Sequence, residues 1–153
     1  MSDEETKYDV FSKRMEATYP KMFGEPYGGF CVGEGWWQVI ESLCANIQHH
    51  IDWKTSTRER LLVDNPYDNK IPEVVAQVTV NQIKEKFGGL RFYYSGGDDT
   101  IDGMVRMAES WAAYSCEECG SRGTKRGGGW IRTLCDAHEE AHQQAIKERF
   151  KNE

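Results

Sequence analysis

Four potential metal ligands stand in two closely spaced pairs toward the C-terminal end of the chain. Cys116 and Cys119 form a Cys-x-x-Cys pair, and Cys135 and His138 form a Cys-x-x-His pair. Two ligands three positions apart can bind one ion from a single tight turn, and a second pair completes a tetrahedron. Because thiolate and imidazole are donors that suit Zn²⁺, the spacing predicts one structural zinc ion bound by these four residues.

The residues around the two pairs predict a zinc module at residues 114–150. Gly120 follows the first pair, where the chain must turn, and the glycines at 123 and 127–129 can serve a hairpin. Residues 136–150 carry apolar side chains at nearly helical spacing. A knuckle, a hairpin and a ligand pair at the start of a helix together resemble the treble-clef zinc fold.

A second zinc motif overlaps the first. His138, Glu139 and His142 match H-E-x-x-H, in which two histidines on a helix bind zinc and the glutamate acts as general base of a protease. Such a site needs a further ligand and a substrate cleft, and it would leave the three cysteines unexplained. We therefore expect His138 to belong to the cysteine group and His142 to lie outside it.

Composition predicts a single small domain, residues 1–153, in the cytoplasm. No apolar run reaches membrane-spanning length, and the first residues, Met1 to Glu5, are acidic, so we expect no membrane partner. In a reducing compartment Cys31 and Cys44 are expected to be free and buried thiols. The formal charge of −6 argues against broad affinity for nucleic acids but is compatible with local basic patches.

Apolar residues at helical spacing predict three helices ahead of the zinc module, at residues 8–19, 36–51 and 101–112. Pro20 ends the first helix, and a residue between Asp98 and Thr100 caps the third. Residues 55–72 mix charged side chains with Asn-Pro and Asp-Asn, which predicts a long surface loop.

A β-hairpin is predicted within residues 74–94, with its turn at Gly88-Gly89. In that register Phe87 faces Leu90, Lys86 faces Arg91 and Ile83 faces Tyr94, so one face is apolar apart from Glu85. Valines at 74, 78 and 80 have the opposite parity from Ile83, which requires a bulge near Asn81.

Two groups of side chains are candidate surfaces for an anionic partner. The outer face of the hairpin carries Lys84, Lys86, Arg91 and Tyr93, and the hairpin of the zinc module carries Arg122, Lys125, Arg126 and Arg132. Basic side chains can contact phosphate, and a tyrosine ring can stack on a base. The alternative is that both groups are ordinary solvated surfaces, as sheet faces and loop tips commonly are.

The predicted fold class is α+β, with helices packed on a small antiparallel β-hairpin or sheet and an integrated C-terminal zinc module. Three segments resemble a known group of proteins: G-E-G-W-W, Q-I-K-E-K-F-G-G-L-R-F-Y-Y, and C-x-x-C-G followed by W-I-R-T-L-C-x-x-H. From about Gly29 onward the chain is similar to small uncharacterised proteins encoded by bacteriophages and bacterial genomes. The resemblance implies a phage or prophage setting in a bacterial host cell, and it assigns no catalytic residues.

Two classes of function follow. The first is a noncatalytic, zinc-stabilised binding protein that recognises a host protein, including a defence component, or a nucleic acid or nucleotide. The second is a small enzyme, either a zinc-dependent hydrolase using Glu139 or a nucleotide-processing protein using the basic hairpin face. The sequence contains no Walker loop, and no Ser-His-Asp or paired-carboxylate motif is recognisable in it. Four protein ligands on the zinc favour the binding protein, whereas His138 and His142 with a bound water favour the enzyme.

Overall fold

The order of elements along the chain follows the apolar patterning. Within residues 4–153, which the computed structural model describes, four α-helices accompany one three-stranded and one two-stranded sheet. The first residues of the acidic start, 1–3, lie outside this part of the chain. The elements are α1 (Lys7–Thr18), β1 (Phe30–Cys31), the 3₁₀ helix η1 (Glu34–Trp36), α2 (Trp37–Asp64), β2 (Ala76–Lys86), β3 (Gly89–Gly97), α3 (Asp99–Ala112), β4 (Thr124–Arg126), β5 (Arg132–Leu134) and α4 (Asp136–Lys151). The α+β class predicted from the sequence is confirmed.

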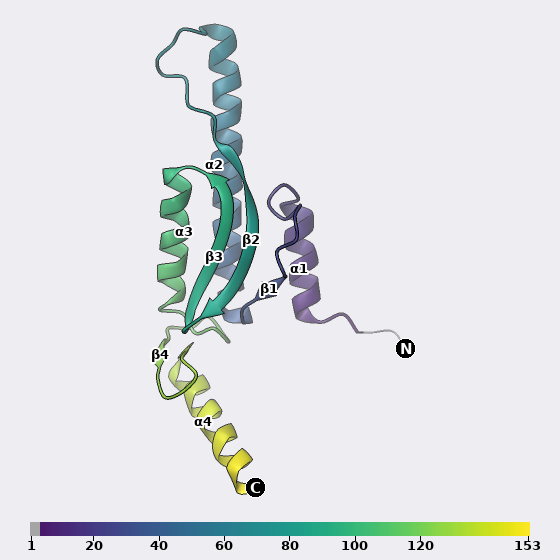
Figure 1. Cartoon of the computed structure of the whole chain (residues 1–153), viewed down its shortest axis with the longest axis vertical. Coiled ribbons are helices and arrows are strands. Elements are labelled where there is room, and N and C mark those ends of the chain that lie inside the picture. The colour runs from purple at the N-terminus through teal and green to yellow at the C-terminus, as the bar shows by residue number, and fades with distance from the viewer. Residues whose placement is uncertain (1–3) are drawn as a thin grey trace.

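The molecule is elongated (Figure 1). Helix α2 runs behind the β2–β3 hairpin, α3 packs on both α2 and β3, and α1 lies on the side of β1. The far half of α2 extends beyond one end of the sheet, and α4 extends beyond the other. No helix within residues 4–153 combines the length and the apolar character that crossing a membrane requires.

Helix α1 is fixed at its start by a capping box and along its inner face by aromatic packing. The Thr6 hydroxyl oxygen accepts a hydrogen bond from the Asp9 N–H, and the Asp9 carboxylate accepts one from the Thr6 N–H. The ring of Phe11 stacks on Trp37 with 4.6 Å between centroids. As predicted, the helix ends just before Pro20, which cannot continue it.

Helix α2 is longer than predicted. Its first half buries the expected apolar stripe, Ile40, Leu43, Cys44, Ile47 and Ile51. The prediction of a loop from residue 55 was wrong, because the helix continues to Asp64. No glycine or proline interrupts residues 37–64, and long charged side chains lose little freedom in a helix. The helix ends where Asn65 precedes Pro66, since proline disfavours the helical conformation of the residue before it.

The hairpin turn lies one residue earlier than predicted. Phe87-Gly88 forms the two-residue loop, both residues have positive φ, and Lys86 pairs with Gly89. Arg91 therefore faces Lys84, so the predicted pairing of Arg91 with Lys86 was wrong. The turn also contacts β5, which local turn rules do not take into account. A turn that begins one residue earlier shifts the pairing of the two strands by two residues, so each side chain stays on its predicted face.

The predicted bulge is present at Asn81. The register shifts there, so Val80 and Ile83 both reach the core despite their opposite parity. As a result Tyr94 faces Val80, and Ile83 faces Phe92 in place of the predicted Tyr94. Apart from Glu85, which lies opposite Leu90 near the turn, the inner face of the hairpin is apolar and belongs to the same core as α2 and α3.

Strand β1 was not predicted. Its two residues pair in parallel with β2, Phe30 with Ile83 and Cys31 with Lys84, which gives the strand order β1-β2-β3. A two-residue strand is too short to show an alternating pattern. Cys31 is exposed on this strand, so its predicted burial was wrong, whereas Cys44 is buried in α2 and both thiols are free as predicted.

Candidate metal centre and basic face

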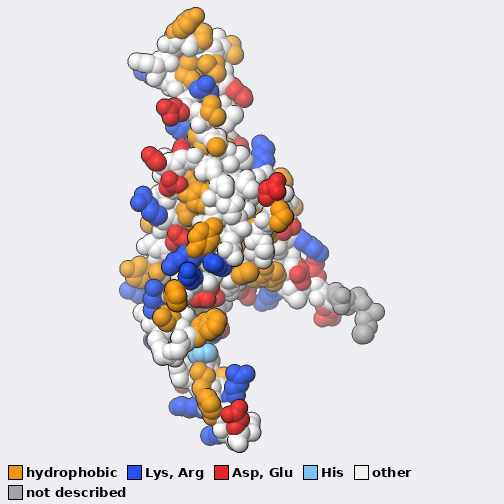
Figure 2. Space-filling model, viewed as in Figure 1, with side chains coloured by type: hydrophobic (Ala, Val, Ile, Leu, Met, Phe, Trp, Pro, Cys, Tyr) orange, Lys and Arg blue, Asp and Glu red, His pale blue; other side chains and the backbone are white. Residues whose placement is uncertain are grey.

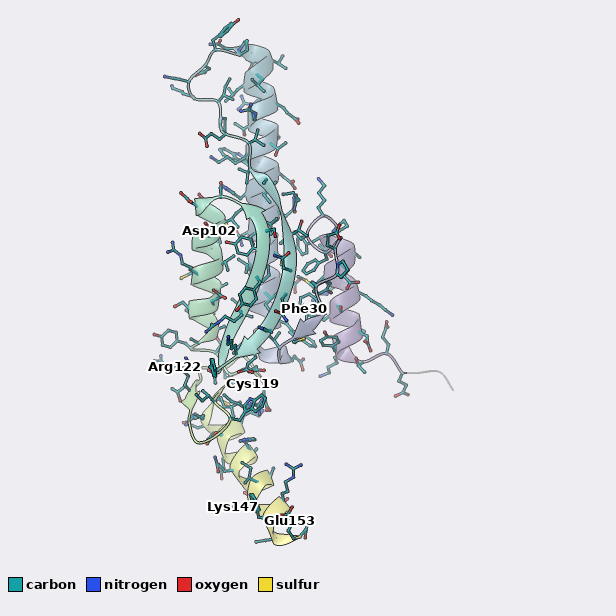
Figure 3. The ribbon with its side chains drawn as sticks, in the orientation of Figure 1. Phe30, Asp102, Cys119, Arg122, Lys147 and Glu153 are labelled. Carbon is teal, nitrogen blue, oxygen red and sulfur yellow. The ribbon has the colours of Figure 1, made fainter. Side chains whose placement is uncertain are left out.

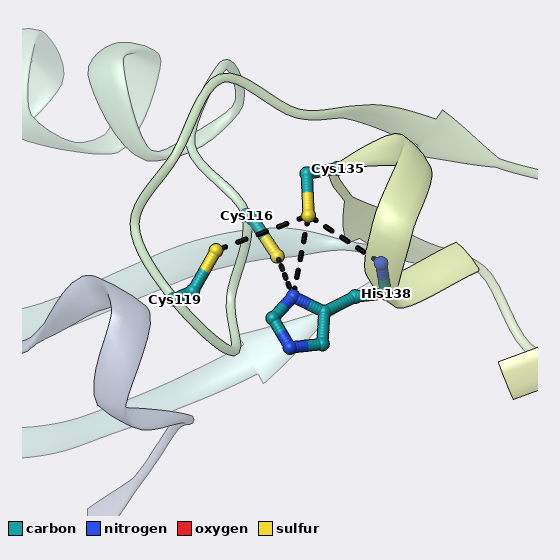
Figure 4. Close-up of side chains that lie close together, drawn as sticks. All are labelled: Cys116, Cys119, Cys135 and His138. Atoms are coloured by element: carbon teal, nitrogen blue, oxygen red, sulfur yellow. Dashed lines mark hydrogen bonds between the residues drawn. The ribbon is translucent and has the colours of Figure 1, made fainter. Parts of the chain in front are cut away.

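The four predicted ligands converge where the loop after α3 meets the start of α4 (Figure 4). One ligand atom from each of Cys116, Cys119, Cys135 and His138 lies within 4.8 Å of the others, and no second group of this kind occurs in residues 4–153. The Cys119 and Cys135 sulfurs are 3.9 Å apart, and His138 Nδ1 is 3.2 Å from the Cys135 sulfur. Tetrahedral zinc separates such ligands by about 3.5 to 3.8 Å, so the cluster could bind a metal ion and is consistent with zinc. His142 lies outside the group.

Backbone hydrogen bonds position each ligand pair. The Cys116 N–H donates to the Ser121 carbonyl at 2.7 Å, and the Gly120 N–H donates to the Cys116 carbonyl at 2.8 Å. Residues 116–120 form this tight turn, the knuckle of the module. Gly120 at its end has a φ of 79°, which the turn requires and which glycine adopts without a steric cost. Cys135 is the N-cap of α4, and its sulfur accepts a hydrogen bond from the His138 N–H. One Cys-x-x-His pair therefore both caps the helix and points two ligands at the centre.

The electrostatics of Cys119 favour binding of a cation, whereas those of Cys135 do not. Hydrogen bonds from the Ser121 hydroxyl and N–H lower the pKa of Cys119 to about 6, so this thiol is mostly ionised at neutral pH. The His138 N–H lowers the pKa of Cys135, but removal from water and the neighbouring thiols outweigh it, and that pKa is raised overall. Thiolate is the form that binds metal, and a bound cation holds neighbouring thiols ionised.

Glu118 contacts one of the candidate ligands, and this contact was not predicted from the sequence. One of its oxygens lies 3.6 Å from Nε2 of His138, and the other accepts a hydrogen bond from Arg132 at 2.9 Å. Metal-binding histidines commonly donate their second ring N–H to a carboxylate, which fixes the ring. The only sequence signal was the pair Glu117 and Glu118 inside Cys-x-x-Cys, and nothing in that pair predicts which of the two contacts His138.

Hydrogen bonds join the C-terminal module, residues 114–151, to the remainder of the chain. They include Trp36 Nε1 to the Ser115 carbonyl at 2.9 Å, the Gly35 N–H to the Glu117 carbonyl at 2.7 Å, and Thr133 Oγ1 to the Gly88 carbonyl at 2.6 Å. Gly35 packs so closely that an added Cβ would lie 2.1 Å from the Cys116 carbonyl oxygen. The knuckle therefore packs on η1, directly before α2, and β5 packs on the hairpin turn.

The basic residues of the module separate into two kinds. Arg126 forms an ion pair with Asp136 at 2.7 Å, and Arg132 forms one with Glu118 at 2.9 Å. Both acidic partners come from outside residues 121–132, which is why that stretch alone looked uniformly basic. Of the four basic residues at positions 122–132, the two that form no ion pair within the described residues are Arg122 and Lys125. Arg122 and Cys119 lie at the same level of the molecule, between the hairpin turn and α4 (Figure 3).

The outer face of the hairpin gathers the other predicted residues. Lys84 lies opposite Arg91, and its Nζ is 5.5 Å from the centre of the Tyr93 ring. Lys86 Nζ lies 5.6 Å from the centre of the Phe87 ring, at the turn. The space-filling view shows basic and hydrophobic side chains together over this end of the hairpin (Figure 2). Among residues 4–153, none of the three cations forms an ion pair.

A cleft of about 340 Å³ separates the hairpin turn from the loop between β4 and β5. It is lined by Glu85, Lys86, Phe87, Gly129, Trp130 and Ile131. Two of these are exposed aromatic residues, Phe87 at 65% and Trp130 at 76%, and the sequence analysis did not single them out. Nothing in the sequence places the two side by side, because their proximity depends on docking of the module. No family model, curated protein or solved structure matches this chain.

Proposed function

We propose that this protein is a noncatalytic binding protein in which one structural Zn²⁺ fixes the C-terminal module against a partner-binding hairpin face. The observation that carries the proposal is the convergence of three sulfurs and one nitrogen from four protein side chains. Four protein ligands close a tetrahedral zinc site, whereas a catalytic zinc keeps a position for water or substrate. The order of knuckle, β4–β5 hairpin and α4 supports a treble-clef-like site.

The hydrolase alternative has less support. His138 directs Nδ1 toward the sulfurs of Cys116 and Cys135, at 3.5 and 3.2 Å, which a two-histidine site does not need. Glu139, the general base of that alternative, accepts a hydrogen bond from Gln143 on the next turn of α4. Both observations favour a structural role for the start of the helix.

The partner that we propose is anionic and binds at the outer face of β2 and β3. The support is the cluster of unpaired cations there, in a chain whose formal charge of −6 would otherwise repel anions. From the sequence resemblance we place the protein in the cytoplasm of a bacterial host cell, in a phage or prophage setting. There its partners would be a host protein, including a defence component, or a nucleic acid or nucleotide.

Metal content and coordination test the closed site. Elemental analysis should give one zinc per chain for the wild type, and Cys116→Ser should lose stoichiometric zinc. His142→Ala is the matched control and should keep the metal. The cobalt-substituted protein should show the visible absorption of a tetrahedral, sulfur-rich site. Full zinc occupancy in Cys116→Ser with an unchanged fold, or loss of zinc in His142→Ala, would overturn the proposal.

A further inference from the structure

We propose that the outer face of the β2–β3 hairpin and the adjoining cleft form a track for single-stranded nucleic acid. This inference rests on the proposed function and names the partner of that same face. Three cations and three exposed aromatic rings make up the track: Lys84, Lys86, Arg91, Tyr93, Phe87 and Trp130. A single strand offers phosphates to the cations and unpaired bases to the rings.

Phe87 is the residue of this surface that folding explains least. Its φ is 52°, a left-handed conformation that glycine and asparagine adopt far more readily. Its side chain is 65% exposed, so packing contributes little in return. Non-glycine residues in this conformation concentrate at functional sites. An exposed phenylalanine here therefore indicates a selected use for the ring.

Trp130 stands on the other wall of the same cleft. It follows three glycines, and the two adjoining ones, Gly128 and Gly129, have positive φ and open space around them. The loop can therefore adjust the indole toward a base lying against Phe87. Glu85 also lines the cleft, but its carboxylate accepts a hydrogen bond from the Gly88 N–H at 2.7 Å and serves the turn.

The cations are arranged to receive phosphates. Lys84 and Arg91 lie directly opposite each other across the ladder, and like charges in such a pair repel. A phosphate between them would remove that repulsion. Lys84 also covers the ring of Tyr93 at 5.5 Å, but an exposed contact between a cation and a ring is weak. The ammonium group can therefore move to a phosphate while a base stacks on the ring.

A single strand fits these observations better than a duplex does. Base faces are hidden within a duplex, so the exposed rings of Tyr93, Phe87 and Trp130 would have nothing to stack on. A duplex also presents a denser row of phosphates, which the acidic remainder of this chain would repel. From Tyr93 to Gly89 the strand spans about 13 Å, which suits a site of only a few nucleotides.

Fluorescence anisotropy tests the class of ligand. The probes are labelled oligothymidylate and oligouridylate of about 12 nucleotides, with a duplex of equal length and inorganic polyphosphate as competitors. We expect saturable binding of the single strands that weakens from about 50 to about 200 mM salt, and at least tenfold weaker binding of the duplex and polyphosphate. The tighter of the two strands identifies DNA or RNA as the natural partner. No saturable binding of either strand at low salt, or equal binding of the duplex or polyphosphate, overturns the inference.

Variants of the turn test the site. Phe87→Asn should relieve the strained turn and raise the melting temperature, yet weaken strand binding roughly tenfold, because about one stacked base is lost. Phe87→Trp should keep the affinity, and Met107→Ala, at an exposed apolar position on α3, is the matched control that should also keep it. The double variant Lys84→Gln with Arg91→Gln should reduce the salt slope by roughly 1.4. If Phe87→Asn binds the single strands as tightly as the wild type does, the proposed nucleic-acid site is wrong.

The two proposals fail separately. Zinc content and cobalt spectra are measured on the same preparations as strand binding. A closed four-ligand site without strand binding overturns the nucleic-acid track alone. An open site with water on the metal overturns the proposed function, whatever the oligonucleotides do.

Discussion

The two parts of this chain are held together by different means. In the body, residues 7–112, apolar side chains from α1, α2, α3 and the three-stranded sheet form one continuous core. In the C-terminal module, residues 114–151, only Ser115, Cys116, Gly123, Thr133 and Leu134 are buried, and α4 has no buried residue at all. A helix without a packed face is marginal in water. The comparison teaches that burial stabilises the body, whereas burial alone does not account for the stability of the module, for which we propose a bound metal.

Metal removal should give the largest effect and should separate the two parts. A structural zinc supplies about 10 to 16 kcal/mol in small zinc domains, far more than the few contacts of this module could replace. In the presence of a chelator we expect α4 and residues 116–134 to lose amide protection while α2 keeps it. Hydrogen exchange followed by mass spectrometry measures both in one sample. Equal loss of protection in α2 would show that the two parts share one source of stability.

A cavity in the body should have the opposite effect. Ile47 is fully buried in α2, and Ile47→Ala should lower the free energy of unfolding by about 2 to 5 kcal/mol. Urea denaturation followed by tryptophan fluorescence gives this value, and zinc stoichiometry should be unchanged. Ile146→Ala removes the same atoms from a partly exposed site on α4 and should cost under about 0.5 kcal/mol. Comparable losses in the two variants would contradict the division between core and module.

The joint between the two parts can be broken without touching a ligand. A Cβ at Gly35 would lie 2.1 Å from the Cys116 carbonyl oxygen and 2.7 Å from the Cys119 nitrogen, so the knuckle must shift. We expect Gly35→Ala to cost about 1 to 3 kcal/mol in stability and also to weaken zinc binding. The control, Gly127→Ala, adds its Cβ to open space. Thermal melts and chelator competition should show a change only in Gly35→Ala. Equal values for both variants would show that packing of the knuckle on Gly35 does not stabilise the module.

Sequence patterns predicted the features that depend on neighbours in the chain. The ligand pairs, the Pro20 stop and the bulge at Asn81 all follow from local spacing, and the structure has each of them. The missed features depend on residues far apart in the chain. Strand β1 exists only through pairing with β2, and Arg132 is paired only because the knuckle brings Glu118 to it. The cleft likewise requires the docked module, so no local pattern could have revealed it.

Acid should affect the body through one carboxylate, and this is the smallest effect that we expect. Asp98 caps α3 by accepting the Ile101 N–H at 3.0 Å and also contacts His50 at 2.8 Å. Burial raises its pKa, but the hydrogen bonds from His50 and from Ile101 outweigh burial and hold the pKa below the ordinary value. A lowered pKa stabilises the fold above the unfolded pKa, and this contribution is lost as pH falls through the folded pKa.

The stability advantage of the wild type over Asp98→Asn should therefore shrink as the pH falls below about 4. Asparagine keeps the capping geometry but does not titrate, and because both proteins carry the same zinc ligands, acid release of zinc cancels in the difference. Asp98→Ala should cost about 1 kcal/mol at neutral pH through loss of the cap. Urea titrations across acid pH measure both effects. An advantage that persists unchanged in acid would assign the stabilisation to a different group.

Strand β1 also has a consequence for the order in which the chain assembles. Helix α2 and the β2–β3 hairpin close short loops and can form early, whereas Phe30 must find Ile83 across the whole of α2 and the loop that follows. The pairing of β1, and the aromatic packing of Phe30 on Phe11 behind it, should therefore form after the folding transition state. Weakening this contact with Phe30→Leu should accelerate unfolding while leaving the folding rate nearly unchanged. The N-terminal quarter of the body would then be the last part to fold and the first to unfold, and its contacts would set the unfolding rate of the whole body.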